Sequence, residues 1–109
     1  MRTPFLQRKT QVGHQGRFKD PLGKRHKSFL VVDEVEIRQH NAPHKLIVIQ
    51  KCLINGKDRE FRLAYWIEGK KPGVRGRLVF GQYALLIPSR DLRKLISKAQ
   101  KKWGKNFGW

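Results

Sequence analysis

Apolar and polar side chains alternate along the middle of the chain in a way that predicts β-strands. Residues 29–38 are rich in β-branched side chains, and apolar and charged positions alternate after Val35, which is the period of a half-buried strand. Residues 46–54 are almost continuously apolar and predict a central strand. Asn55 and Gly56 follow directly. Because both residues tolerate positive φ, they predict a tight hairpin into the next strand.

A third strand is predicted over residues 59–68, where the alternation divides the side chains between two faces of a sheet. The apolar set is expected to face the core and consists of Phe61, Leu63, Tyr65 and Ile67. The opposite face carries Glu60, Arg62, Ala64, Trp66 and Glu68. A fourth strand is predicted near residues 77–87, and Gly81 within it indicates a bulge or a close approach to the backbone.

After Pro88 the period becomes that of an α-helix. Its single apolar stripe consists of Leu92, Leu95, Ile96, Ala99 and Trp103. Ser89 is a preferred N-cap residue, Asp91 places negative charge in the first turn, and Gly104 predicts the end of the helix. Because a sheet with one apolar face needs a cover, core packing is favoured over an interfacial membrane helix. The predicted fold class is therefore α+β, a four-stranded antiparallel sheet followed by a C-terminal helix (β-β-β-β-α).

Residues 1–27 show no sustained period of either kind, and they contain two prolines and three glycines. We interpret this segment as a basic, flexible N-terminal arm, with a tail that only aids solubility as the alternative. Residues 28–109 are then predicted to form a single domain, since the whole chain is about the length of one domain.

Charge narrows the range of partners. The chain carries 25 Lys and Arg against 8 Asp and Glu, a net charge of +17. The excess lies at the two ends, where residues 1–27 have eight basic side chains against Asp20 and residues 89–109 have seven against Asp91. Such a chain repels itself unless a polyanion neutralises it. A nucleic acid is therefore the favoured partner, ahead of a membrane surface or an acidic protein.

Composition also excludes several classes of protein. Cys52 is the only cysteine, which excludes a disulfide framework and a Cys-x-x-Cys zinc pair; within its apolar run it is expected to be buried. No apolar run approaches the roughly 18 residues of a membrane span. The N-terminus has no apolar signal region, so an intracellular location, cytoplasm or nucleoid, is expected.

The case for catalysis or for a bound metal is weak. Asp58 and Glu60 could form part of a nuclease metal site, but such a site needs further acidic ligands. His40 and His44 lie four residues apart, and a metal site using them would also need partners; two exposed imidazoles are the simpler interpretation. We therefore predict no enzyme activity, no metal and no cofactor.

The case for binding a single-stranded nucleic acid is stronger, since such a surface needs cations for phosphates and aromatic faces for bases. Arg62 and Trp66 share one face of the third strand, unless a helix or a second subunit covers Trp66. The predicted nucleic-acid-binding residues are Arg62, Trp66, Lys70, Lys71, Arg75 and Arg77 of the strand and its loop, with Lys24, Arg25 and Lys27 of the arm. The terminal Trp103, Phe107 and Trp109 could pack across a dimer or add a further stacking surface.

The order of elements resembles that of the superfamily of single-stranded-DNA-binding transcriptional coactivators, which includes the Whirly and PUR proteins. The stretches that carry the resemblance are residues 61–67, 70–78 and 87–89. The resemblance covers residues 28–103 in topology and 61–96 in residue pattern, and the fourth segment is longer than the family's usual strand. It implies a curved sheet that binds single-stranded DNA or RNA, and a homodimer. It also implies that Arg62, Trp66, Lys70, Lys71, Arg75 and Arg77 form the surface that contacts the strand.

The sequence thus predicts a non-catalytic nucleic-acid-binding protein that prefers single strands. Phosphate contacts should supply most of the affinity, and stacking on Trp66, together with Tyr65 or Tyr83, the remainder. The alternatives are a structural RNA-binding protein of a ribosome-like particle and, with less support, a metal-dependent nuclease using Asp58 and Glu60.

Overall fold

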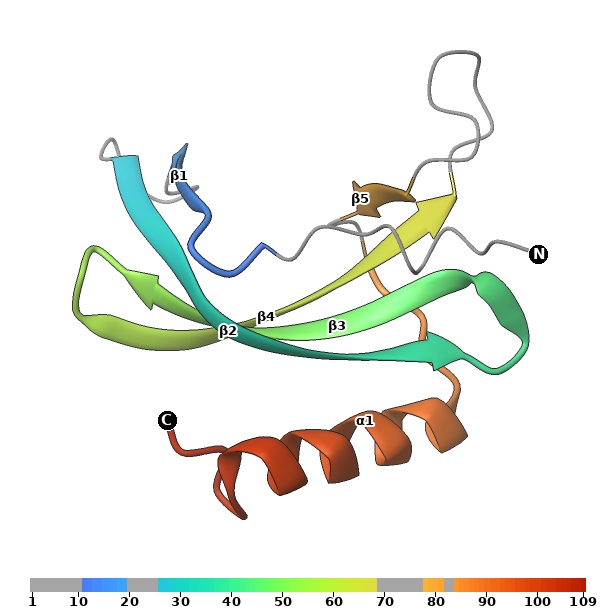
Figure 1. Cartoon of the computed structure of the whole chain (residues 1–109). Coiled ribbons are helices and arrows are strands. Elements are labelled where there is room, and N and C mark those ends of the chain that lie inside the picture. Colours follow the sequence, from blue (N-terminus) through green and yellow to red (C-terminus); the bar gives the residue numbers. More distant parts are fainter. Residues whose placement is uncertain (1–10, 20–25, 69–77, 82–83) are drawn as a thin grey trace.

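The computed structural model describes residues 11–19, 26–68, 78–81 and 84–109, in which one helix lies across one face of a curled antiparallel sheet (Figure 1). The strands follow each other in chain order, with β1 at one edge and β5 at the other. They are β1 (Gln15–Lys19), β2 (His26–Gln39), β3 (Ala42–Ile54), β4 (Asp58–Glu68) and β5 (Leu78–Gly81). The helix, α1, spans Ser89–Trp103. The predicted α+β class is confirmed, but the sheet has five strands where four were predicted.

The additional strand, β1, comes from the segment that was predicted to be a flexible arm. It pairs with the start of β2, Gly16 lying opposite Phe29. A Cβ atom at Gly16 would lie 2.6 Å from the ring of Phe29, so a glycine is needed where this ring crosses the backbone of β1. The sheet therefore extends into the predicted arm, and β2 also begins earlier than predicted.

The three long strands form as their patterns predict. Residues 46–52 of β3 are all buried, which confirms a central strand, and Cys52 is among them at 3% exposure. Asn55 and Gly56 have φ of 51° and 74°, the positive values that the predicted hairpin requires. The register of β2 with β3 shifts between Val31 and Asp33, a bulge that changes which side chains of β2 face α1.

The helix packs mainly over β2 and β3. Leu95 and Ala99, both fully buried, pack against Val35, Ile47 and Ile49. This leaves β4 poorly covered and corrects a prediction. Its apolar set faces the same side as α1, because Leu63 pairs with Ile49 in the sheet. It is nevertheless not a buried core, since the exposed fractions are 40% for Phe61, 45% for Leu63 and 41% for Ile67.

Both ends of α1 are defined in the structure. Gly104, with φ of 98°, follows the last helical residue and ends the helix as predicted. At the other end Pro88 takes the N-cap position and no side chain caps the backbone, so Ser89 is the first helical residue instead of the predicted cap. Asp91 is 1% exposed and bonds to another element, as described below.

The described part of the last strand is β5, and residues 84–87, which were also predicted to belong to it, have no regular structure. The predicted close approach at Gly81 is confirmed, since a Cβ atom there would lie 2.4 Å from the ring of Tyr65.

The terminal aromatic residues pack on the chain's own sheet. Trp103 and Phe107 contact the ring of Phe61, and Lys51 lies 4.5 Å from the ring centroid of Trp103 and 5.3 Å from that of Trp109. In this structure these rings therefore belong to the domain itself.

Candidate nucleic-acid interface

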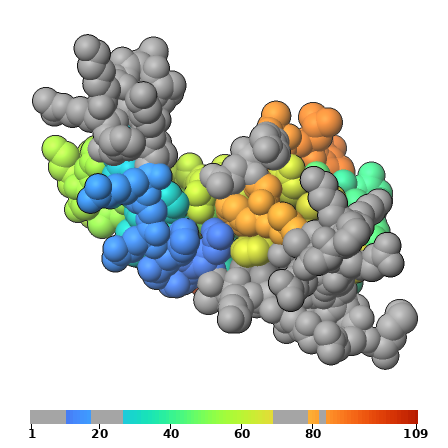
Figure 2. Space-filling view, turned by 90° about the horizontal axis from the view of Figure 1, so that it is seen from above, coloured from blue at the N-terminus to red at the C-terminus, as the bar shows by residue number. Residues whose placement is uncertain are grey.

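The face of the sheet opposite α1 carries two of the predicted site residues, Arg62 and Trp66. Figure 2 looks onto this side of the molecule, where β1 (blue) and β5 (orange) both lie. The pairing of residues between neighbouring strands determines which side chains meet on this face. Arg62 pairs with Gln50 on β3, and Trp66 pairs with Phe80 on β5. The prediction that Arg62 and Trp66 share one face is confirmed.

Arg62 lies between two aromatic rings that come from distant strands. Its Cζ atom is 4.8 Å from the ring centroid of Phe29 in β2 and 5.0 Å from that of Phe80 in β5. A guanidinium group at this distance is attracted by the electron-rich face of a ring. The curl of the sheet, which brings both rings to the same cation, therefore builds an aromatic site around Arg62.

A network of hydrogen bonds fixes the guanidinium in this position. Nε of Arg62 donates to Oε1 of Gln50 at 2.8 Å, and Nη2 donates to Oε1 of Gln11 at 3.2 Å. Nε2 of Gln50 donates in turn to Oε1 of Gln11 at 2.9 Å and to Oε1 of Glu34 at 3.1 Å. Because Gln50 is fully buried, these bonds satisfy polar atoms that would otherwise be costly to bury.

Burial lowers the pKa of Arg62, while the nearby carboxylate of Glu34 acts in the opposite direction. An arginine starts from so high a pKa that it stays charged in proteins. Arg62 is therefore a permanent, half-buried cation whose orientation is set by neutral amides and by rings.

Trp66 is only half-buried, and its own strand neighbour contacts it. Its ring and that of Phe80 meet edge-to-face, with centroids 5.0 Å apart and an interplanar angle of 68°. Because Trp66 lies four residues from Arg62 on β4, its ring is on the face of the sheet opposite α1. Tyr65, by contrast, points to the side of α1, because it pairs with Ile47, and Lys45 lies 5.1 Å from its ring centroid. Tyr65 is thus not a stacking partner beside Trp66.

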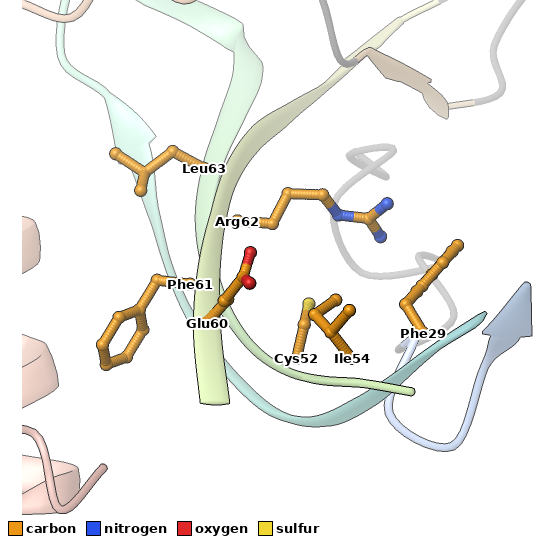
Figure 3. Close-up of a pocket in the computed structure, with 7 residues that line it drawn as sticks. All are labelled: Phe29, Cys52, Ile54, Glu60, Phe61, Arg62 and Leu63. Carbon is orange, nitrogen blue, oxygen red and sulfur yellow. The ribbon is translucent and has the colours of Figure 1, made fainter. Parts of the chain in front are cut away.

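A pocket of about 490 Å³ opens beside Arg62 (Figure 3). Arg62, Phe29, Cys52 and Ile54 project on one side of β4, whereas Phe61 and Leu63 project on the other. Burial raises the pKa of the Cys52 thiol, and the carboxylate of Glu60, which pairs with Cys52 in the sheet and also lines the pocket, acts in the same direction. An aromatic ring, a cation and an apolar floor in a pocket of this size are what a flat, partly polar ligand needs.

The structure places the other predicted site residues as follows. Lys27 lies half-buried in β2, beside β1. Six of the predicted residues, and Tyr83, lie outside the described residues: Lys24, Arg25, Lys70, Lys71, Arg75 and Arg77. Sequence reasoning missed Phe29 and Phe80, because only the register of the strands places them beside Arg62.

The alternative sites find no support in the part of the chain that the structure describes. No group of three or more His, Cys, Asp and Glu side chains that could hold a metal is present among those residues. His40 and His44 each pair with a carboxylate, Nδ1 of His40 lying 2.7 Å from Oδ2 of Asp91 and Nδ1 of His44 lying 3.1 Å from Oε2 of Glu68. Within residues 11–19, 26–68, 78–81 and 84–109, no helix has the length and apolar character of a membrane span.

Comparisons with models of known protein families, with curated proteins and with solved structures find no match to this chain. Its function is therefore inferred from its own residues, and the likeness to the single-stranded-DNA-binding coactivators stays a prediction.

Proposed function

We propose that this protein is a non-catalytic nucleic-acid-binding protein that holds a single strand of DNA or RNA on the sheet face opposite α1. The observation that supports this best is the site around Arg62. A fixed guanidinium lies between Phe29 and Phe80, Trp66 contacts Phe80, and a pocket opens at Phe29 and Arg62.

Single strands suit this site because their bases are free to leave the stack. Sequence-tolerant binding of single strands combines aromatic faces, on which bases stack, with cations that follow the phosphates. An unpaired base in the pocket would meet the ring of Phe29 and the guanidinium of Arg62. Splayed bases commonly stack on aromatic side chains and on arginine guanidinium groups. A base within a duplex has both of its faces covered by its neighbours and could not reach them.

The charge of the surface supports the same proposal. Two of the few carboxylates, Asp33 and Asp91, bond to groups within the fold. Asp33 accepts hydrogen bonds from Lys102 and Trp103, and Asp91 accepts one from His40. With 25 basic side chains against 8 acidic ones, the surface retains a large excess of cations. The predicted basic residues of the loop and arm would then bind the phosphates of the strand.

The test is the binding of a fluorescein-labelled oligo(dT) and of a matched RNA to the variant Trp66→Ala, measured by anisotropy. Loss of a stacking ring should weaken binding by about 1–3 kcal/mol, roughly 5- to 150-fold in Kd. The matched control is Trp109→Ala, since Trp109 packs beside Lys51 on the helix side of the sheet. It should change Kd by less than about twofold, within the roughly 0.4 kcal/mol that this factor represents.

Thermal unfolding of both variants separates loss of binding from loss of fold. If Trp66→Ala is folded and binds oligo(dT) as tightly as Trp109→Ala does, stacking at this site is contradicted.

A further inference from the structure

The solvent-facing side of α1 is a second cationic surface, on the other side of the sheet from Arg62. Since Leu95 and Ala99 face the sheet, the helical period directs Arg90, Arg93, Lys94, Ser97 and Lys101 outward, and all five are exposed. The helix contains one acidic residue, Asp91, which is buried. No carboxylate of α1 therefore offsets these cations.

The lysines of α1 divide into two groups with different roles. Lys98 and Lys102 fasten the helix to β2, because Nζ of Lys98 donates to the carbonyl of Glu36 at 2.6 Å and Nζ of Lys102 donates to Asp33 and to the carbonyl of Glu34, both at 2.9 Å. Arg93, Lys94 and Lys101 form no ion pair or hydrogen bond with any residue that the structure describes. They are the cations available to an external anion.

These cations lie in a row that suits a polyanion. With a rise of 1.5 Å per residue, the twelve residues from Arg90 to Lys101 span roughly 16 Å along the helix. Two surface hollows flank the row and share Ser97 and Lys101. The first, of about 420 Å³, is lined by Ile37, Arg38, Lys94, Ser97, Lys98 and Lys101. The second, of about 370 Å³, is lined by Ser97, Gln100, Lys101 and Lys105. A phosphate group in either hollow would meet two or more cations and the hydroxyl of Ser97.

We propose that this outer face of α1, together with Arg38 and Lys105, binds the phosphate backbone of a double-stranded nucleic acid. A duplex presents one charge per 1.7 Å of its axis and needs no stacking surface. The aromatic residue of α1, Trp103, is half-buried against the sheet, so the outer face of the helix offers cations without rings. A single strand, which gains much of its affinity from stacking, is better served by the face around Arg62.

The consequence goes beyond binding one strand. The helix α1 covers one face of the sheet and Arg62 projects from the opposite face (Figure 1). One molecule can therefore hold a single strand on one side of the sheet and a duplex on the other. Such a protein bridges two nucleic-acid segments, as packaging or assembly of a nucleoprotein particle requires.

The test compares two double variants of the full chain that lose the same charge. Lys94→Gln/Lys101→Gln removes two cations of the helix face and keeps good helix-forming residues. The control, Arg17→Gln/Lys57→Gln, removes two exposed cations that lie away from α1. Arg17 is in β1, where it pairs with Ser28, and Lys57 is in the turn between β3 and β4. Binding of a 20-base-pair duplex DNA is measured between about 50 and 200 mM salt, the range over which phosphate contacts are resolved.

In the helix-face variant the log–log plot of duplex affinity against salt should be less steep, its negative slope smaller in magnitude by about 1.8. Each lost contact to a duplex phosphate accounts for about 0.9 of this change. The control variant should leave that slope unchanged. Equal slopes for both variants would overturn the proposal. A less steep slope with oligo(dT) alone would also overturn it, because the helix face would then bind the single strand.

Bridging is tested on beads that carry oligo(dT), by capture of a labelled duplex of unrelated sequence. The wild-type protein should retain the duplex and Lys94→Gln/Lys101→Gln should not, although it still binds the beads; equal capture would overturn the proposal. The variant Trp66→Ala separates the two surfaces. It should bind oligo(dT) roughly 5- to 150-fold more weakly and bind the duplex as wild type does, so failure of the single-strand site leaves the duplex result unaffected.

Discussion

Arg62 has two roles at the scale of the single residue. Its guanidinium satisfies the buried amide of Gln50 and also forms one wall of the pocket beside Phe29. A charged group that is held by hydrogen bonds and rings is already oriented before any ligand arrives. Such preorganisation reduces the entropy that binding must otherwise overcome.

Replacement of Arg62 by alanine should lower the free energy of unfolding by about 1–3 kcal/mol, the cost of leaving a buried acceptor such as Oε1 of Gln50 without its donor. The measurement is urea unfolding followed by circular dichroism. Lys57→Ala, an exposed change in the β3–β4 turn, serves as the control and should stay within about 0.5 kcal/mol of wild type. Two variants of equal stability would show that the network around Arg62 is not structural.

At the scale of the element, Asp91 fastens the start of α1 to the turn between β2 and β3. Its carboxylate accepts hydrogen bonds from the backbone N–H of His40 at 3.2 Å and 3.3 Å, and it lies 2.7 Å from Nδ1 of the same residue. Burial alone would raise the pKa of Asp91, but the hydrogen bonds from His40 and the charges of His40 and Arg90 outweigh it and lower the pKa.

This direction determines how stability depends on pH. A carboxyl group whose pKa is lower in the folded state stabilises the fold above its unfolded pKa of about 3.9 and loses that contribution as the pH falls further. We therefore expect wild type to be more stable than Asp91→Asn at pH 5 to 7, and the difference to shrink below about pH 4. Urea unfolding across this range measures it. A difference that is constant with pH would contradict the role given to this carboxylate.

The spacing of apolar and polar residues predicted β2, β3, β4 and α1, because each of these elements is long enough to show a repeating pattern. They did not predict β1, whose residues 15–19 contain a glycine and a single apolar side chain. The burial of β4 also could not be predicted. Alternation shows which side chains share a face, but the position of α1 over β2 and β3 depends on the whole fold.

The candidate site was predictable only within one strand. Arg62 and Trp66 lie four residues apart in β4, so alternation alone places them on one face. Phe29 and Phe80 belong to β2 and β5, which begin at His26 and Leu78, and their rings meet Arg62 through the curl and register of the sheet. No local pattern contains that information.

At the scale of the whole molecule, we propose the homodimer that the family resemblance implies. Leu63, Ile67 and Val79 are each at least 40% exposed, and the register places them on the same side of neighbouring strands. Ile96 at the edge of α1 is also 36% exposed. A second copy of the chain would bury this apolar strip, which α1 leaves uncovered.

Light scattering after size exclusion, at a salt concentration that screens the charge of each copy, should give about twice the 12.8 kDa of the chain. Leu63→Asp should shift the protein to the monomer. Val12→Asp, an exposed valine ahead of β1, should not. A monomeric wild type at all concentrations would contradict the dimer.

The central claim, that the protein holds a single strand mainly through its phosphates, is tested most directly by the salt dependence of oligo(dT) binding. Each phosphate neutralised on a single strand contributes about −0.7 to the log–log slope. Contacts from all seven predicted residues of loop and arm, namely Lys24, Arg25, Lys27, Lys70, Lys71, Arg75 and Arg77, would give a slope of about −5. The account predicts a slope that approaches this value, and an affinity that does not change between low and moderate salt would contradict it.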